Sequence, residues 1–477
     1  MRNYVGGEWV EAAAYERRDV VNPATEEVLA EVPMGGATDV GRAVAAAKAA
    51  FPSWRRVAPV QRARFLFALR NLLEEHFEEL AAIVTAEHGK TLEESRGSVR
   101  RGIECVEVAC GAPTLLMGQA LEDVAPGIDC ISVRQPMGVF ACIAPFNFPV
   151  MVPLWFLPFA VACGNTFVVK PSEQVPLSMQ RVFELMHEAG LPPGVVNLVH
   201  GGRDAAEALI EHPDVEGLSF VGSSPVARAV YREATAHGKR VQALGGAKNF
   251  MVVMPDANLE GALDAACASA FGCAGERCLA GSVAVAVGDA YEAVRDGLRK
   301  RASEIVVGEG GQPGVTMGPV ISAEHRDRVL AMIETGIAEG ADLIFDGRQL
   351  AVPEKGYFVG PCLFDGVTPQ MTIGREEIFG PVMCIMRVDS LDAAMALIAD
   401  HPLANASSIF TTQGAAARQF MYEVPASMAA VNIGVAAPMS FFGFGGAKGS
   451  FYGDLKAHGR EAFDFFTDRK VLMSRWD

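Results

Sequence analysis

The chain has 477 residues, 50% hydrophobic and 21% charged, and this length predicts two or three domains with substantial cores. Its formal net charge of −16 argues against a nucleic-acid-binding protein, because such proteins neutralise phosphates with basic side chains. The ten cysteines form no C-x-x-C pair and no zinc-like spacing, so we expect free thiols, a cytoplasmic location and no metal site.

The chain starts with a small β-rich segment over residues 1–35, where Gly-Gly and Asn-Pro break short apolar runs. Helical periodicity follows, and residues 119–135 then alternate around a Pro-Gly turn, which predicts a hairpin. The predicted helices of this first part cover 37–51, 61–88 and 93–110.

From residue 139 onward, strand and helix patterns alternate, which predicts a parallel sheet covered by helices on both faces. Ligands bind such sheets beyond the carboxyl ends of the strands. The apolar run 139–169 contains four prolines, which a spanning helix tolerates poorly, so we expect buried strands and helices and no membrane span. The predicted strands are 139–144, 167–170, 195–199 and 217–221, with helices at 151–163, 177–188, 205–211 and 226–237.

A second α/β region is predicted from residue 241 to about 432, and it contains the stretch F-G-C-A-G-E-R-C-L-A-G-S. Arg277 directly precedes Cys278, and a cationic neighbour favours the nucleophilic thiolate. We interpret Cys278 as the nucleophile and Cys273 as structural; the alternative is two half-buried core cysteines. Three glycines of the stretch indicate close approach of a substrate rather than packing: Gly272, Gly275 and Gly281.

Polar residues follow two strands of the first predicted sheet. Asn147, in A-P-F-N-F-P, can donate to an oxygen that gains negative charge, although a turn asparagine is the alternative. Lys170 and Glu173, in K-P-S-E, can bind the hydroxyls of a ribose, and the carboxylate would oppose a 2′-phosphate, which favours NAD over NADP. A helix start capped by Ser172 explains K-P-S-E equally well.

A third strand is followed by F-V-G-S-S-P, in which Gly222 and Ser223 precede a predicted helix. The N-terminal amides of that helix could face a pyrophosphate. The usual G-x-G-x-x-G fingerprint is absent.

These segments, in this order, resemble the NAD-dependent aldehyde dehydrogenase superfamily over nearly the whole chain, and E-E-I-F-G-P at Glu376 to Pro381 extends the resemblance. The resemblance implies an α/β aldehyde dehydrogenase-like fold with three parts. They are a Rossmann-type NAD-binding domain (1–118 and 136–244), a catalytic domain (245–433) and a small β bridging or oligomerisation element (119–135 and 434–477).

Within the superfamily, the chain is most similar to the CoA-acylating methylmalonate (malonate) semialdehyde dehydrogenases. The runs A-P-F-N-F-P-V-M-V-P-L-W, R-G-I-E and A-G-E-R-C-L-A carry this likeness. It implies that Cys278 is the nucleophile and Asn147 the oxyanion donor. Arg101 and Arg277 would hold the substrate carboxylate, although a solvated helix arginine explains Arg101 equally well. The implied cofactor residues are Ala144, Phe146, Lys170, Glu173, Gln174, Ser223, Gly245 and Glu377, with Phe379 beside the nicotinamide.

One absence indicates the acyl acceptor. Hydrolytic aldehyde dehydrogenases carry a water-activating glutamate in E-L-G-G-K, whereas this chain has V-Q-A-L-G-G-A-K-N with no acid. A CoA thiol ionises more readily than water and needs no such base. Glu276 is a disfavoured substitute base. Phe250 stands where the subfamily usually has histidine, so substrate preference could differ.

We therefore predict an enzyme that oxidises methylmalonate or malonate semialdehyde with NAD and transfers the acyl group, after decarboxylation, to CoA. The products would be propionyl-CoA or acetyl-CoA. The alternatives are a hydrolytic aldehyde dehydrogenase and a non-catalytic protein that kept the fold. An exposed strand edge in the bridging element would need a partner subunit, which predicts a homodimer or homotetramer.

Overall fold

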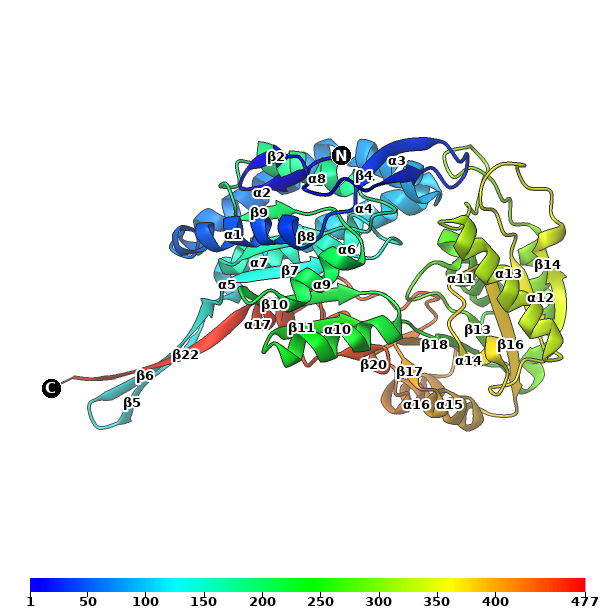
Figure 1. Cartoon of the computed structure of the whole chain (residues 1–477). Helices are drawn as coiled ribbons and strands as arrows, with labels where there is room; N and C mark the ends of the chain where they lie inside the picture. The colour runs from blue at the N-terminus through cyan, green and yellow to red at the C-terminus, as the bar shows by residue number, and fades with distance from the viewer. Residues whose placement is uncertain (477) are drawn as a thin grey trace.

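The computed structural model describes residues 1–476, and two separate sheets form its framework (Figure 1). The first sheet has eight strands in the order β2-β1-β9-β8-β7-β10-β11-β21. These strands are β1 (Asn3–Val5), β2 (Glu8–Val10), β7 (Val139–Ile143), β8 (Thr166–Lys170), β9 (Val196–Leu198), β10 (Val215–Val221), β11 (Arg240–Leu244) and β21 (Phe451–Tyr452).

The five central strands of this sheet are parallel, and apolar side chains cover both of its faces. Along β7, Phe140 and Cys142 enter one core while Val139 and Ala141 enter the other, because successive strand residues point to opposite faces. The predicted doubly covered parallel sheet is confirmed. Its helices are α1 (Ala37–Trp54), α2 (Pro59–Glu75), α3 (Phe77–His88), α4 (Leu92–Cys110), α6 (Met151–Leu154), α7 (Leu157–Cys163), α8 (Leu177–Glu188), α9 (Arg203–Glu211) and α10 (Ser224–Ala236).

Two predicted helices are each divided in the structure. The run 61–88 breaks at His76, whose φ of −98° and ψ of 20° end α2 and begin α3. The run 151–163 breaks before Leu157, where Pro158 takes a place in the first turn of α7. Proline suits a first turn because its missing N–H has no helical partner there.

The second sheet has seven strands in the order β14-β15-β16-β13-β12-β18-β19 and encloses a core of its own with its helices. Its strands are β12 (Phe250–Val253), β13 (Val283–Val287), β14 (Asp342–Asp346), β15 (Cys362–Asp365), β16 (Val382–Val388), β18 (Ala406–Phe410) and β19 (Met428–Val431). Its principal helices are α11 (Leu259–Phe271), α12 (Tyr291–Ser303), α13 (Ala323–Ala338), α15 (Leu391–Asp400) and α16 (Gly414–Glu423).

The predicted hairpin is present as β5 (Gln119–Ala125) and β6 (Ile128–Pro136), and β22 (Thr467–Arg475) pairs with β6 along its whole length. This three-stranded arm projects from the body of the molecule (Figure 1). Every residue of β5 is exposed, and Met473 on β22 is 70% exposed. β22 and β5 are both edge strands, so the arm presents unpaired backbone groups on two sides.

The C-terminal tail also completes the first sheet. β21 pairs antiparallel with β11, and Phe463 and Phe466, in and just after α17 (Gly459–Phe465), are fully buried in the core beneath it. We propose the division into an NAD-binding domain, a catalytic domain and a bridging element. The C-terminal tail would then contribute both to the NAD-binding domain and to the bridging element. Within residues 1–476, no helix combines the length and apolarity that crossing a membrane requires.

Candidate active site

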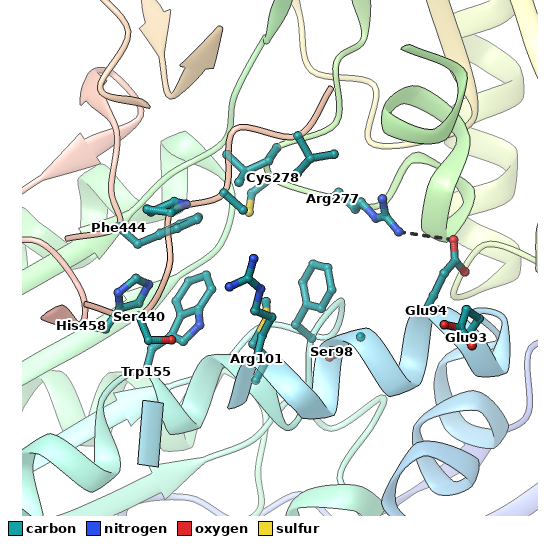
Figure 2. A pocket seen from close by; sticks show the side chains of 17 residues that line it. Glu93, Glu94, Ser98, Arg101, Trp155, Arg277, Cys278, Ser440, Phe444 and His458 are labelled. Carbon is teal, nitrogen blue, oxygen red and sulfur yellow. Dashed lines mark hydrogen bonds and ion pairs between the residues drawn. The ribbon is translucent and has the colours of Figure 1, made fainter. Parts of the chain in front are cut away.

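Cys278 lies where two cavities meet. One, of about 440 Å³, is lined by Arg101 and Arg277 and is called here the arginine cavity (Figure 2). The other, of about 680 Å³, lies at the carboxyl ends of the first sheet's strands and is called the strand-end cavity. Cys278 lines both, so a molecule in either cavity can reach the same thiol.

The backbone around Cys278 is held firmly. Cys273, Ala274 and Gly275 take left-handed φ angles of 51°, 51° and 75°, a conformation that L side chains adopt only when surrounding structure enforces it. Behind them, the carbonyl of Cys278 accepts hydrogen bonds of 3.0 Å from both Asn249 Nδ2 and Asn405 Nδ2. Two buried amides therefore fix the position of the Cys278 backbone.

The glycines of this stretch serve packing, and our expectation that they admit a substrate is wrong. A Cβ on Gly275 would lie 2.1 Å from the carbonyl oxygen of Gly380. A Cβ on Gly272 would meet the guanidinium of Arg277, and one on Gly281 would meet the Met251 side chain. Their small size lets the loop lie against the rest of the protein.

The thiol of Cys278 is neutral in the free protein. Burial, followed by the charge of Glu377, raises its pKa to about 12, and the opposing effect of Arg277 is smaller. The Arg277 guanidinium instead donates to Cys273 Sγ at 3.2 Å and to Glu94 Oε1 at 3.4 Å. Arg277 therefore favours the thiolate, as expected of a cationic neighbour, but its effect on the pKa of Cys278 is smaller than that of burial.

Asn147 borders the strand-end cavity with its side chain buried. Its Nδ2 donates to the carbonyl of Glu276 at 2.9 Å. An amide nitrogen carries two hydrogens, and no second partner of this one lies within residues 1–476, so one N–H remains for an oxygen in the cavity.

Most predicted cofactor residues line the strand-end cavity: Phe146, Glu173, Gln174, Ser223, Gly245, Glu377 and Phe379. The other two, Ala144 and Lys170, line an adjoining cavity of about 840 Å³ that shares Glu173 with it. Ser223 immediately precedes α10, as predicted. The structure thus gathers residues from five separate segments at one edge of the sheet.

Two carboxyl groups in these cavities have defined partners. Lys170 Nζ donates to the carbonyls of Pro171 and Gly201 and lies 3.4 Å from Glu173 Oε2. Glu377 Oε1 accepts from the backbone N–H of Ala247 at 2.9 Å, and burial raises the pKa of Glu377 to about 7. Both carboxyls can accept hydrogen bonds from hydroxyls of a bound ligand.

The two predicted substrate arginines face the arginine cavity from different elements. Figure 2 shows Arg101 rising from α4 toward the loop of Cys278, whereas Arg277 turns toward Glu94. Arg101 Nη1 contacts Glu104 Oε2 and Met439 Sδ, each at 2.9 Å. The cavity that holds the thiol therefore also offers a guanidinium.

Several lining residues were not predicted. His325 and Arg328, on α13, border the strand-end cavity, and Trp155, Phe444 and His458 border the arginine cavity. Trp155 ends the run A-P-F-N-F-P-V-M-V-P-L-W, but nothing in that run marks it as a lining residue, and the other four belong to no motif described above. Phe250 lines neither cavity; it is buried in β12 with its ring 5.4 Å from that of His401.

The aldehyde dehydrogenase family model matches residues 9–472. The chain belongs to the aldehyde dehydrogenase family. Malonate-semialdehyde dehydrogenase of Halalkalibacterium halodurans is 51% identical over 100% of this chain and 98% of the relative. Malonate-semialdehyde dehydrogenase 2 of Geobacillus kaustophilus is 52% identical over 100% of this chain and 99% of the relative.

Solved structures agree with this assignment. The crystal structure of methylmalonate-semialdehyde dehydrogenase from Oceanimonas doudoroffii has a TM-score of 0.98 and 45% identity, over 100% of this chain and 98% of that one. A structure from Sinorhizobium meliloti 1021, assigned as a methylmalonate-semialdehyde dehydrogenase and complexed with NAD, has a TM-score of 0.98 and 41% identity with the same coverage. The predicted fold and family are confirmed.

Because the pKa of Cys278 is raised to about 12, its alkylation by iodoacetamide in the free enzyme should rise about tenfold per pH unit from pH 7 to 9.5. Glu377→Gln removes a negative charge and should raise the rate at pH 9 by about 3- to 10-fold. Peptide mapping by mass spectrometry measures the modification. Glu173→Gln, in the same cavity, is the control, and a plateau below pH 8 would contradict the raised pKa.

Proposed function

We propose that this enzyme oxidises malonate or methylmalonate semialdehyde with NAD and transfers the resulting acyl group to CoA. The observation that carries the proposal is the position of Cys278 between a cavity with two arginines and a cavity at the strand ends. The relatives named malonate-semialdehyde dehydrogenase, at about 50% identity over essentially the whole chain, support the substrate.

The strand-end cavity and its neighbour fit NAD. The two cavities adjoin at Glu173 and lie at the carboxyl ends of parallel strands, where dinucleotides bind such sheets. Glu173 and Lys170 would hold one ribose, the first amides of α10 would face the pyrophosphate, and Glu377 would hold the second ribose. Gly246 leaves room for the Glu377 carboxyl, because a Cβ there would lie 2.2 Å from its Oε2.

The chemistry starts when the Cys278 thiol releases its proton to solvent and its sulfur attacks the aldehyde carbon. The remaining N–H of Asn147 and the backbone N–H of Cys278 would stabilise the oxyanion that forms. Bound NAD would supply a positively charged ring, which favours the thiolate, and would accept the hydride from the carbon that is bonded to Cys278. The acyl group is then held as a thioester on Cys278.

A carboxylate in the β position allows that acyl group to lose carbon dioxide, because the neighbouring carbonyl accepts the electrons. The enolate that forms then takes a proton from solvent. Arg101 is suited to hold this carboxylate, since guanidinium groups bind carboxylates with paired hydrogen bonds. Arg277 would contribute charge and would keep the loop in place through Glu94.

The carboxyls around the arginine cavity favour a thiol over water as acyl acceptor. Glu94 accepts from the backbone N–H of Cys273 and from Arg277, and the Glu93 side chain is 86% exposed and pairs with Arg96. Glu276 is fully buried and lines neither cavity. None of these three is placed to activate a water at Cys278. Glu377, which shares the strand-end cavity with Cys278, would be engaged by the ribose of NAD, so deacylation should await CoA.

Product formation tests the proposal. Mixed with NAD and malonate semialdehyde alone, the enzyme should release about one NADH per active site and then stop; added CoA should restore turnover and give acetyl-CoA. Stopped-flow absorbance and mass spectrometry of the products measure both. Sustained NADH formation with free acid as product, in the absence of CoA, would favour the hydrolytic alternative.

The role of Arg101 can be tested separately. Arg101→Leu should lower kcat/KM for malonate semialdehyde by about 100-fold, because it removes a charge-assisted hydrogen bond, but that for propanal by less than about 3-fold. Arg100→Leu is the matched control, since its guanidinium pairs with Glu74 and lies outside both cavities. Equal loss for both aldehydes would remove Arg101 from carboxylate binding.

We also propose that the arm mediates assembly into a homodimer or homotetramer in the cytoplasm. Its edge strands and the exposed Val471, Met473 and Trp476 support an intersubunit contact, and ten free cysteines suit a reducing compartment.

The double variant Val471→Asp with Met473→Asp should shift the mass measured by light scattering toward the monomer. An unchanged mass would contradict the role of the arm, and Tyr422→Asp, exposed on α16, is the control.

A further inference from the structure

Glu276, two residues before the nucleophile, carries a carboxyl group that is fully buried behind the catalytic loop. Its Oε1 accepts a hydrogen bond of 3.1 Å from the backbone N–H of Ile321 and lies 3.5 Å from His325 Nε2. Its Oε2 lies 3.8 Å from His88 Nε2 and has no hydrogen-bond partner within residues 1–476. The mechanism described above does not use this group.

The backbone of Glu276 is bonded to both parts of the oxidation machinery. Its carbonyl accepts the 2.9 Å hydrogen bond from Asn147 Nδ2, and its N–H donates to the carbonyl of Cys273 at 3.0 Å. Lys90 Nζ holds the other side of Asn147 by donating to its carbonyl at 2.5 Å. A shift of Glu276 therefore moves the oxyanion donor and the left-handed turn together.

The side chain of Glu276 also supports an aromatic wall of the strand-end cavity. The His88 ring is stacked at 6.0 Å on Phe146, and Phe146 contacts Phe379 edge-on at 5.8 Å. His325 Nε2 hydrogen-bonds the carbonyl of Phe379 at 2.6 Å, and Phe379 has a left-handed φ of 57°. The two histidines that flank the Glu276 carboxyl thus lie against the phenylalanines of this wall.

The carboxyl of Glu276 is neutral in this setting. Neither neighbouring histidine favours a cation: burial lowers the pKa of His325, and it lowers the pKa of the fully buried His88 well below its usual value. Lys90, whose charge opposes the effect of burial, donates to the carbonyl of Asn147. Burial raises the pKa of Glu276 well above its usual value. A buried carboxylate without a partner is unfavourable, whereas a carboxylic acid needs only hydrogen bonds.

We propose that Glu276 is a positioning residue for thioester formation, which acts as a neutral hydrogen-bonding group to hold Asn147 and the Phe146–Phe379 wall in register with Cys278. This inference rests on the proposed function, since it takes Asn147 as the oxyanion donor. It assigns Glu276 no proton transfer, in contrast to a role as substitute base for water.

Two variants of similar size separate these roles. Glu276→Gln keeps an acceptor for the Ile321 N–H and adds neutral donors, so the rate of the NADH burst should stay within about 3-fold of wild type. Glu276→Met fills the same space without hydrogen bonds, so the burst rate should fall about 100-fold, as expected when an oxyanion donor is misplaced. Both variants leave the core filled, and thermal melting checks that they are folded.

The action through Asn147 is tested by a double-mutant cycle. In an Asn147→Ala background, Glu276→Met should lower the burst rate by no more than about 10-fold, because the oxyanion donor it positions is gone and only the Phe146–Phe379 wall is still disturbed. Glu87→Gln, a second fully buried carboxyl that accepts from the backbone N–H groups of Leu177 and Ser178, should leave the burst unchanged.

The possible failures are distinct. A Gln variant as slow as the Met variant, a Met variant as fast as wild type, or additive effects in the Asn147→Ala background would each overturn the positioning role. A wild-type enzyme that shows no NADH burst with malonate semialdehyde would instead overturn the proposed function.

Discussion

The position of the Cys278 backbone is the constraint on which the site depends. Two asparagine amides hold its carbonyl, and three consecutive left-handed residues precede it. Reactivity in a preorganised site falls steeply when groups move by about 1 Å, so this backbone must be fixed from behind. The second sheet supplies that support, because Asn249 directly precedes β12 and Asn405 directly precedes β18.

Burial and a neighbouring carboxyl keep the Cys278 thiol protonated. Burial and Glu377 raise the pKa of Cys278, and Arg277 is occupied by Glu94 and Cys273. Oxidants attack thiolates far faster than thiols, so a neutral sulfur is protected in the free enzyme.

Local patterns in the sequence were enough to predict both sheets, the hairpin and the strand ends at which Asn147, Glu173 and Ser223 gather. These features follow from periodicity and from parallel topology. The resemblance to the family, rather than any pattern, supplied Glu377 and Phe379. The direction of the Arg277 side chain and the roles of His325 and His88 depend on contacts between distant segments, and no local rule encodes them. The glycines were misinterpreted for the same reason, since Gly380, against which Gly275 packs, lies in another loop.

The C-terminal tail ties the order of synthesis to the order of folding. β11 gains its outer neighbour only from β21, and the core under the first sheet is filled by Phe463 and Phe466. A ribosome adds these residues after all the other strands of the first sheet, so that sheet stays incomplete until they have emerged. Nascent chains that end early would expose that unfilled core, which makes prematurely terminated products natural targets for chaperones and proteases.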